Sequence, residues 1–404
     1  MQVTVIADDL TGAADTGACF AGRGLTTLVS LHPDHIADAD VVVVSSNSRE
    51  LAANDATEYL GRIGAQIRSL GADSGWVYKK IDSTLRGNPD IELAALMDAL
   101  DTHQALIAPA FPNQSRTTIG GRQLVDGKLL SETSFGNEVP TSELSRLFRQ
   151  SARGRDSRLI DLNNIRQGHA AVADIFDERP GLFIADAETE SDLRILARAA
   201  VSSGIRMLCG SAGLARALQE CAELRPEFPS PNIPELVSGA TLIVAGSRHQ
   251  KTMEQIEYCG DAGIPIVRLP RSIPFTTEEC DRIVAETVGK LSSHPTVVLT
   301  PVGVQTEAEP KRIAQYLGQI TKSSVQSRMI GGLVVTGGQT ALSVCSALDA
   351  RTLWLQGEIG PGVAWGRLIN GQRPGLLIAT KAGGFGTPQT LLEASAFLLN
   401  GVGI

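Results

Sequence analysis

Short runs of β-branched and aliphatic residues alternate along this chain with longer segments in which apolar residues return every three or four positions. Alternation of this kind is typical of a mainly parallel sheet flanked by helices. The runs in the first half predict strands at residues 2–7, 41–45, 76–81, 104–108, 182–185 and 205–209. The longer segments between them predict helices at 53–69, 90–100 and 191–202. The first part of the chain is therefore expected to be α/β.

A proline-rich stretch divides this alternation in two. Residues 225–239, RPEFPSPNIPELVSG, contain four prolines in a short polar segment and fit a linker better than a packed element. The alternation then restarts with strand-like runs at 241–246, 295–300, 332–338 and 375–384. We predict two α/β domains, 1–228 and 229–404, with mainly parallel sheets flanked by helices and an active-site cleft between them.

Charge and composition exclude several classes of function. The net charge of −8 argues against nucleic-acid or membrane-surface binding, because both depend on a broad basic face. No run approaches the roughly 18 apolar residues of a membrane span, and no basic segment precedes the first strand-like run. We therefore expect a cytoplasmic protein. The cysteines include no CxxC pair and the histidines no HExxH, so no structural zinc is expected.

The first candidate site is the segment 6–17, IADDLTGAADTG, where an apolar strand ends in Asp8 and Asp9. Ligands of open α/β sheets bind at the carboxyl ends of the strands. A carboxylate placed there can accept a proton from a substrate hydroxyl or hold a metal ion. Alternatively, Asp9 or Thr11 caps the helix that comes next, and the sequence leaves both interpretations open.

A cluster of charged and polar residues follows another predicted strand, at Lys79, Lys80, Asp82, Ser83 and Arg86. Such a cluster in an acidic protein suits a carboxylate or phosphate ligand. Side chains alternate along a strand, so Lys80 and Asp82 share one face and we expect Lys80, not Lys79, to meet the ligand. The alternative is a solvated loop with a local ion pair. Arg49, also just after a strand, is a second candidate for binding a carboxylate.

Three glycine-containing turns follow apolar strands in the second half: VAGSRHQKT at 244–252, VVTGGQTA at 334–341 and TKAGGFG at 380–386. Successive backbone N–H groups in such turns form concave sites for phosphate oxygens. A single glycine turn often serves only to reverse the chain. The recurrence in one domain favours a nucleotide or phosphate site.

Several well-known nucleotide motifs are missing from the sequence. There is no GxxxxGK followed by Ser or Thr, no GxGxxG after the first strand, and no set of protein-kinase motifs. The segment GSAGLA at 210–215 resembles part of a nucleophile elbow, but GxSxG is not met. We interpret this segment as a glycine turn that leads into a helix.

The motifs IADDLTGAADTG, KKIDSTLRGN, GSAGLA, TGGQTA, GEIGPGV and TKAGGFG, in this order, resemble those of the four-carbon acid sugar kinase family. The resemblance covers both domains. It implies an enzyme that phosphorylates a tetronic acid with ATP and Mg²⁺, holding the acid in the N-terminal domain and the nucleotide in the C-terminal domain. Small-molecule ligands, with no nucleic-acid or membrane partner, are the expected interactions.

Carried over residue by residue, the resemblance places the sugar acid at Asp9, Arg49, Lys80, Asp82 and Ser83, and the charged cluster adds Arg86. It places the nucleotide at Ser247, Gly337, Gly338, Gln339, Gly383 and Gly384. The first motif reads ADDLTGAAD, whereas the 3-oxo-tetronate kinases tend to have ADDFTGATD. This favours D-threonate, then D-erythronate, with a 3-oxo-tetronate as the alternative. The family has an Asp-Pro pair near Asn137 and Glu138, so the role of the loop at 134–140 stays open.

The hypothesis for the chemistry is in-line transfer of the γ-phosphate to the terminal hydroxyl of the acid. Asp9 is the expected base, while Arg49, Lys80 and Ser83 fix the carboxylate and hydroxyls. Asp8 is a candidate for positioning Mg²⁺, but the metal ligands are unknown and the sequence does not separate its role from that of Asp9.

Two alternatives of other classes remain open at this point. An NAD-dependent sugar-acid dehydrogenase also suits two α/β domains, although its fingerprint is missing. A solute-binding protein has a similar architecture, although no signal peptide is recognisable. The sequence decides neither the stereoisomer used nor whether the protein is a homodimer.

Overall fold

The computed structural model describes residues 1–32, 36–139, 141–234, 239–270, 274–303, 309–326 and 330–400. The chain divides into two compact units. The first consists of Met1–Leu25 and Ile36–Phe228, and the second of Thr26–His35 and Pro229–Ile404. The assignment of Thr26–His35 to the second unit was not predicted, because the sequence shows a single division of the chain.

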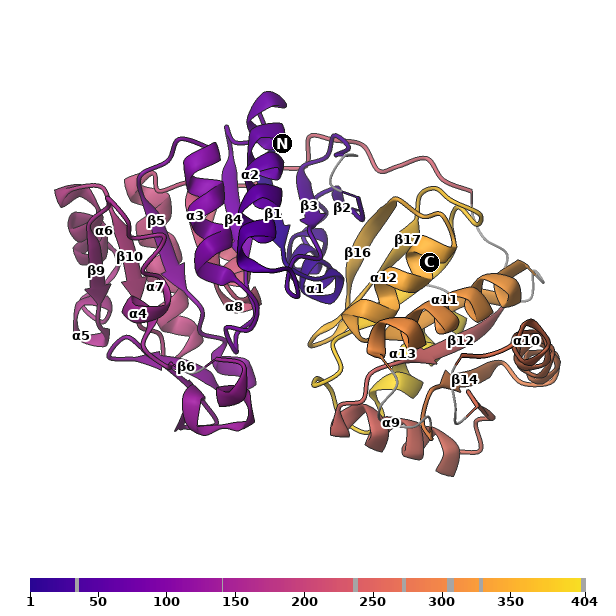
Figure 1. Ribbon diagram of the computed structural model, residues 1–404. Coiled ribbons are helices and arrows are strands. Elements are labelled where there is room, and N and C mark those ends of the chain that lie inside the picture. The colour runs from indigo at the N-terminus through magenta and orange to yellow at the C-terminus, as the bar shows by residue number, and fades with distance from the viewer. Residues whose placement is uncertain are drawn as a thin grey trace. The chain divides into compact units, whose positions relative to one another are not determined.

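The first unit is built on a parallel sheet with the strand order β3-β1-β4-β11-β5-β10-β9 (Figure 1). Its strands are β1 (Val3–Ala7), β3 (Val41–Ser45), β4 (Trp76–Lys80), β5 (Ala105–Ala108), β9 (Ser157–Ile160), β10 (Leu182–Ala185) and β11 (Met207–Gly210). Its helices are α1 (Leu10–Ala21), α2 (Ala53–Ser69), α3 (Pro89–Ala99), α4 (Leu144–Leu147), α5 (Leu162–Ile165), α6 (His169–Glu178), α7 (Glu190–Ser203) and α8 (Ala212–Cys221).

A small antiparallel sheet lies in the same unit, between β5 and β9 in the sequence. It consists of β6 (Arg116–Ile119), β7 (Arg122–Val125) and β8 (Lys128–Leu129). The 3₁₀ helices η1 (Pro112–Gln114), η2 (Leu130–Glu132) and η3 (Ser134–Asn137) flank it. This sheet was not predicted from the sequence, because its strands are short and partly polar.

Helices cover both faces of the main sheet in the first unit. Helices α1, α7 and α8 pack together on one face, and α2 and α3 pack together on the other (Figure 1). Every residue of β1 and β3 is consequently buried, which explains why these strands are continuous β-branched and aliphatic runs. The loops at the strand ends are therefore anchored to a sheet whose two faces are covered by packed helices.

The second unit has a parallel sheet that continues into antiparallel strands. The parallel strands, in the order β13-β14-β12-β15-β18, are β12 (Ala240–Ala245), β13 (Ile266–Arg268), β14 (Thr296–Thr300), β15 (Ile330–Thr336) and β18 (Leu377–Lys381). The antiparallel strands β17 (Val363–Leu368), β16 (Thr352–Gly360) and β2 (Thr27–Ser30) come after β18 in the sheet. The helices are α9 (Gln250–Asp261), α10 (Thr277–Leu291), α11 (Pro310–Gln326), α12 (Gly338–Ala347) and α13 (Thr390–Leu399).

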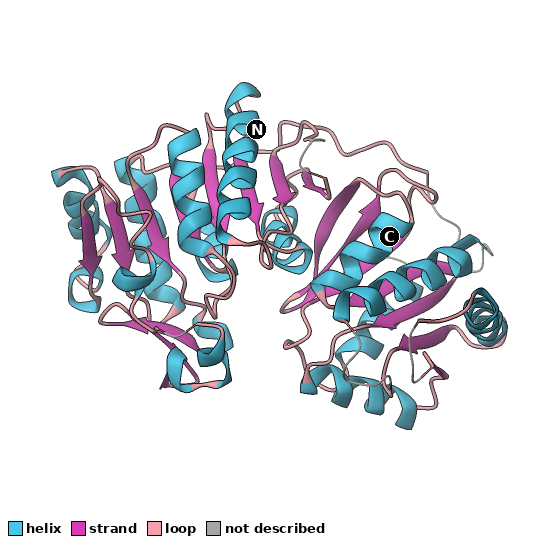
Figure 2. Cartoon of the chain, viewed as in Figure 1, coloured by secondary structure: helices cyan, strands magenta, loops and turns pink. Residues whose placement is uncertain are grey.

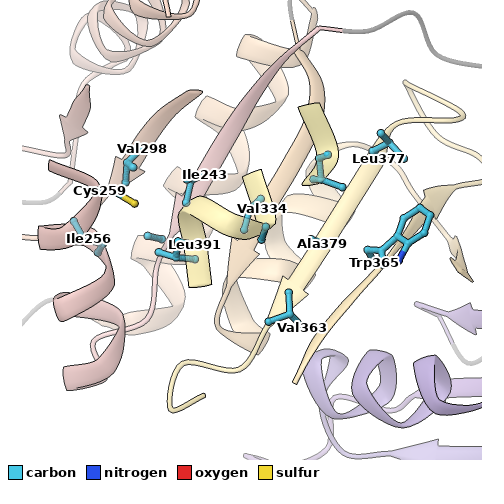
Figure 3. Packing of buried hydrophobic residues seen from close by; sticks show 13 residues of the cluster. Ile243, Ile256, Cys259, Val298, Val334, Val363, Trp365, Leu377, Ala379 and Leu391 are labelled. Atoms are coloured by element: carbon cyan, nitrogen blue, oxygen red, sulfur yellow. The ribbon is translucent and has the colours of Figure 1, made fainter. Parts of the chain in front are cut away.

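A cluster of aliphatic side chains fixes the helices to this second sheet (Figure 3). Ile243, Val334 and Ala379 come from neighbouring parallel strands, and Ile256 of α9 and Leu391 of α13 pack against the same face. Figure 2 shows helices on both faces of each main sheet. Helices α2 and α11 are the longest described, and no described helix is both long and apolar enough to cross a membrane.

The predicted mixed α/β architecture is confirmed, and the predicted strands and helices lie within about three residues of the observed ones. The antiparallel hairpin β16–β17 was not predicted. Both of its strands contain glycine and partly exposed positions, which break the apolar pattern on which the strand predictions depended.

Candidate functional site

Three neighbouring strands of the first unit end at the same edge of its sheet. Ala7 of β1 pairs with Ser45 of β3 and with Lys80 of β4, and all three strands run parallel. The segments after these strands carry the predicted acid-binding residues. The edge thus brings together Asp8, Asp9, Arg49, Lys80, Asp82, Ser83 and Arg86.

Arg49 binds both aspartates that come after β1. Its Nε and Nη2 atoms donate to the two carboxylate oxygens of Asp8 at 2.8 and 2.9 Å, and its Nη1 atom donates to Oδ2 of Asp9 at 2.8 Å. Burial alone would raise the pKa of Asp8, but Arg49, Lys79 and Lys80 outweigh it and hold the pKa below its ordinary value. Asp8 is therefore an ionised anchor for the Arg49 guanidinium.

The guanidinium of Arg49 keeps donors for a ligand. Arginine has five N–H donors, and three of them are used on the two aspartates. Two N–H groups remain, one on each Nη atom, on a side chain that is 23% exposed. A carboxylate ligand is a suitable acceptor for such charged donors.

Asp9 is the N-cap of α1. Its Oδ1 atom accepts the N–H of Gly12 at 2.7 Å, and its Oδ2 atom accepts the hydroxyl of Thr11 at 3.1 Å in addition to Arg49. The capping interpretation is thus correct for Asp9. A base role is compatible with it only through Oδ1, which accepts fewer hydrogen bonds than Oδ2.

Lys79 and Lys80 point to opposite faces of β4, as the alternation of side chains along a strand requires. Lys79 is fully buried and its Nζ atom lies 2.6 Å from a carboxylate oxygen of Glu92 on α3. The Nζ atom of Lys80 donates to the carbonyl of Ile81 at 2.9 Å, and a Cβ atom on Gly12 of α1 would lie 3.0 Å from it. Lys80, and not Lys79, is therefore on the side of Asp9.

The loop after β4 is held by its own aspartate. Asp82 accepts hydrogen bonds from the backbone and hydroxyl of Thr84 and, at 2.6 Å, from Nε of Arg86. Burial would raise the pKa of Asp82, but Arg49, Arg86 and Lys80 hold it well below its ordinary value. The ion pair of the alternative interpretation is present between Arg86 and Asp82, yet the loop is not simply solvated, because Ser83 and Thr84 are buried.

The small antiparallel sheet and the segment after it contact this loop. The side-chain amide of Gln123 on β7 is buried and donates to the carbonyl of Ser83 at 2.8 Å. The Arg86 guanidinium lies 5.6 Å from the centre of the Phe135 ring. Phe135 belongs to the loop at 134–140, in which Asn137 and Glu138 are exposed and Pro140 lies outside the described residues. This loop therefore borders the candidate acid site.

The glycine turns of the second unit also meet at one sheet edge. Ala245 of β12 pairs with Thr336 of β15, which pairs with Lys381 of β18. A Cβ atom on Gly383 would overlap Oγ of Ser247, so this close approach of two turns requires glycine. Gly337 has a φ of +99°, a backbone conformation that favours glycine. The edge collects Ser247, Gly337, Gly338, Gln339, Gly383 and Gly384.

Backbone N–H groups are available at this edge. Helix α12 begins after Gly337 without a side-chain cap, which leaves the N–H groups of its first turn, including Gly338 and Gln339, without intrahelical partners. Within the described chain, the N–H groups of Gly383 and Gly384 donate no hydrogen bond. N–H groups concentrated in this way bind phosphate oxygens.

Sequence reasoning missed several residues that shape the sites. Gln123 lies in an unpredicted strand, and Lys381 is the last residue of a strand whose pattern is apolar. Thr252 and Gln255 of α9 donate to carbonyls of the turn after β18. Thr252 is the last residue of the segment 244–252 and Gln255 follows it closely, and this position in the chain is their sequence signal. Ser211 of GSAGLA is buried and caps α8. This segment therefore has a structural role in the core of the first unit.

No group of three or more His, Cys, Asp or Glu side chains that could hold a metal ion occurs among the described residues. Both oxygens of Asp8 accept hydrogen bonds from Arg49, and a role of Asp8 in positioning Mg²⁺ stays a prediction. The second edge, with its N–H groups and close glycine turns, fits the phosphates of a nucleotide.

Together, the fold and the two edges define the class: a two-unit α/β protein with a candidate anion site in each unit. Residues 3–218 match the family of sugar-binding N-terminal domains, and residues 242–391 match the nucleotide-binding C-terminal domains. The chain belongs to the four-carbon acid sugar kinase family.

Similar curated proteins span nearly the whole chain. A D-threonate kinase of Salmonella typhimurium is 31% identical over 98% of each chain. A D-threonate kinase of Cupriavidus necator is 32% identical over 98% of this chain and 97% of its own, and a D-erythronate kinase of Heliobacterium modesticaldum is 28% identical over the same shares. The predicted family and the predicted class of enzyme, an ATP-dependent sugar-acid kinase, are confirmed.

Solved structures share the fold. A Salmonella typhimurium protein superposes with a TM-score of 0.80 at 23% identity and covers 98% of both chains. A Haemophilus influenzae protein gives a TM-score of 0.74 at 23% identity, covering 98% of this chain and all of its own. At this level of identity the likeness concerns the fold alone.

Proposed function

We propose that this kinase phosphorylates the 4-hydroxyl of D-threonate, with D-erythronate as the next candidate and a 3-oxo-tetronate as the alternative. The observation that carries the proposal is the guanidinium of Arg49, which Asp8 and Asp9 fix at the edge where Lys80, Asp82 and Ser83 also lie. A guanidinium held in one orientation beside a lysine can bind the carboxylate of a short sugar acid, while neighbouring polar side chains bind its hydroxyl groups. The names of the similar kinases support the same substrate class.

Each side chain has a role that its contacts favour. The two remaining N–H groups of Arg49 and the ammonium of Lys80 bind the substrate carboxylate. Asp82 and Ser83 bind the hydroxyl groups. Arg86 is held between Asp82 and the Phe135 ring and forms the rim of the site.

The base is Asp9, acting through Oδ1. The proton of the substrate hydroxyl moves to this oxygen, the hydroxyl oxygen bonds to the γ-phosphorus of ATP, and the bond from that phosphorus to the bridging oxygen of ADP breaks. The N–H groups of Gly338, Gln339, Gly383 and Gly384 offset the charge on the phosphate oxygens. Asp8 acts on Arg49, which keeps the acid oriented for transfer.

Mg²⁺ is expected to enter as a complex with ATP, because the described side chains form no ligand set for it. A cytoplasmic location follows from the use of ATP, which is an intracellular substrate. A homodimer remains a prediction.

The first motif supports the choice of acid only indirectly. Leu10 and Ala14 distinguish ADDLTGAAD from the pattern of the 3-oxo-tetronate kinases, and both side chains are buried in α1. Any effect of these positions on substrate choice must therefore act through packing beneath Asp9. A Phe at position 10 would need more room under the same helix.

The test is ADP formation with D- and L-threonate, D- and L-erythronate and the 3-oxo acids. We expect turnover with D-threonate and a KM for the acid that rises at least about 100-fold in Arg49→Lys, because lysine cannot reproduce the two-pronged donor. Arg68→Met, at an exposed arginine of α2, is the matched control and should behave as wild type. Turnover with none of these acids would refute the proposed substrate class.

A further inference from the structure

Lys381, the last residue of β18, is a buried lysine that the proposed mechanism does not use. Its Nζ atom donates to the carbonyls of Ala382 at 2.9 Å, Gly383 at 3.4 Å and Phe385 at 3.0 Å. All three acceptors belong to the glycine turn that borders the nucleotide edge. The ammonium of Lys381 therefore hydrogen-bonds three carbonyl groups of this turn, which all face the same side.

The direction of these carbonyls determines the direction of the N–H groups. In a trans peptide, the C=O of one residue and the N–H of the next point in opposite directions. Carbonyls of Ala382, Gly383 and Phe385 that face Lys381 therefore direct the N–H groups of Gly383, Gly384 and Gly386 away from it. Within the described chain, these three N–H groups donate no hydrogen bond.

Neighbouring groups hold the turn in the same orientation. The hydroxyl of Thr252 donates to the carbonyl of Gly383 at 2.9 Å, and the amide of Gln255 donates to that of Phe385 at 3.0 Å. The Phe385 ring packs so closely against Gly362 that a Cβ atom there would overlap it. Lys381 is the member of this set whose ammonium reaches three carbonyls.

We infer that Lys381 is a positioning residue of the nucleotide site, which orients the N–H groups of the turn toward the phosphates and places a buried positive charge behind them. The inference rests on the proposed nucleotide role of this edge. Its ligand class is a nucleoside di- or triphosphate. Lys381 acts through the turn and not by contact with the reacting atoms.

The protonation state of Lys381 gives this role a measurable signature. Burial, with a smaller effect from Lys251, lowers the pKa of Lys381 to about 7. A neutral amine has only two N–H groups and cannot donate to three carbonyls. Bound phosphate adds negative charge that favours the ammonium, so nucleotide binding above pH 7 should take up a proton.

Other charged groups on the neighbouring elements must be considered. His249 and Lys251 stand at the start of α9, Glu393 of α13 is exposed, and Arg367 of β17 pairs with Leu377 at the opposite end of β18. Of these, only Lys251 contributes to the pKa of Lys381. The ring of His249, a second ionisable side chain beside Lys251, lies near Gly384.

The experiment is calorimetric titration of the full chain with ADP between pH 6 and 8.5, in buffers of different ionisation enthalpy. We expect the Kd of the wild type to rise up to about 10-fold per pH unit above pH 7, with proton uptake. Lys381→Met should bind at least about 10-fold more weakly at pH 6.5, with a flat profile. Lys381→Arg, which stays charged, should also lose the pH dependence.

Two further variants sharpen the test. Lys251→Met removes a like charge and should move the wild-type profile to higher pH, whereas Lys290→Met, on the surface of α10, should leave it unchanged. If Lys381→Met does not fold, Lys381→Arg and Lys251→Met still decide the outcome. A pH profile that persists in Lys381→Met or Lys381→Arg belongs to His249 and overturns the inference while the proposed function stands. A wild type that binds no ADP at any pH overturns both.

Discussion

Replacing Asp8 and Asp9 separately by asparagine distinguishes an anchoring carboxylate from a reacting one. Asp8→Asn leaves one carbonyl oxygen for Arg49 and turns an NH₂ group toward the second guanidinium donor. Removing one partner of a buried ion pair costs about 3–5 kcal/mol. Arg49 is 23% exposed and keeps its bond to Asp9, so we expect a smaller loss, about 2–3 kcal/mol.

Asp9→Asn should have a small effect on stability and a large effect on catalysis. Asparagine caps helices about as well as aspartate, so the N–H of Gly12 stays satisfied, and weakening the one bond from Arg49 to Oδ2 should cost only about 1 kcal/mol. The base, however, is removed, and kcat should fall by about 10²–10⁴. Asp8→Asn should instead act mainly on the KM for the acid, through the loosened Arg49.

The assay combines urea unfolding, monitored on the transition of the first unit, with steady-state ADP formation. Asp38→Asn, at an exposed aspartate of the same unit, is the control and should change neither. An Asp9→Asn variant with nearly wild-type kcat would refute the base role. An Asp8→Asn variant as stable as wild type would refute the anchoring role.

Three further predictions concern other parts of the molecule. Gly383→Ala introduces a Cβ atom that overlaps Oγ of Ser247, so the KM for ATP should rise at least about 10-fold at an unchanged KM for the acid, and Ser247→Gly should partly restore it; a KM for ATP that does not change contradicts the packing of the two turns. Lys79→Met leaves Glu92 buried without its partner and should destabilise by about 3–5 kcal/mol, whereas the double change to Met at both positions should recover much of this in a urea titration. The lowered folded-state pKa of Asp82 contributes stability that is complete above its unfolded value, about pH 4, and is lost as the pH falls further. Melting temperatures should therefore be level from about pH 6 to 5 and drop below about pH 4, with a smaller drop in Asp82→Asn.

The strand ends of both units could be predicted because parallel strands buried on both faces appear in the sequence as continuous apolar runs. Asp8 and Asp9, Arg49 and Lys80 lie at the ends of such runs or just after them, and parallel strands bring their carboxyl ends to one edge of the sheet. Alternation of side chains along β4 was sufficient to separate Lys80, on the side of Asp9, from Lys79, on the side of Glu92. The segment Thr26–His35 could not be assigned to the second unit, because its partner β16 is distant in sequence and irregular.

The roles of individual polar groups were harder to predict than their positions. The sequence places Asp8 and Asp9 side by side, but only the hydrogen bonds of Arg49 and Gly12 distinguish the two. Gln123 reaches Ser83 from a strand too short and polar to be recognised. Lys381 looks like the polar end of an apolar strand, and its role depends on three carbonyls that no motif describes.

The decisive measurement for the proposed activity is NMR of the reaction mixture after incubation of the protein with ATP, Mg²⁺ and D-threonate. We predict equal amounts of ADP and of a phosphate monoester whose phosphorus couples to the protons at C4 of the acid. Release of the γ-phosphate as inorganic phosphate, or ADP formation that is independent of the acid, would contradict phosphorylation of the 4-hydroxyl.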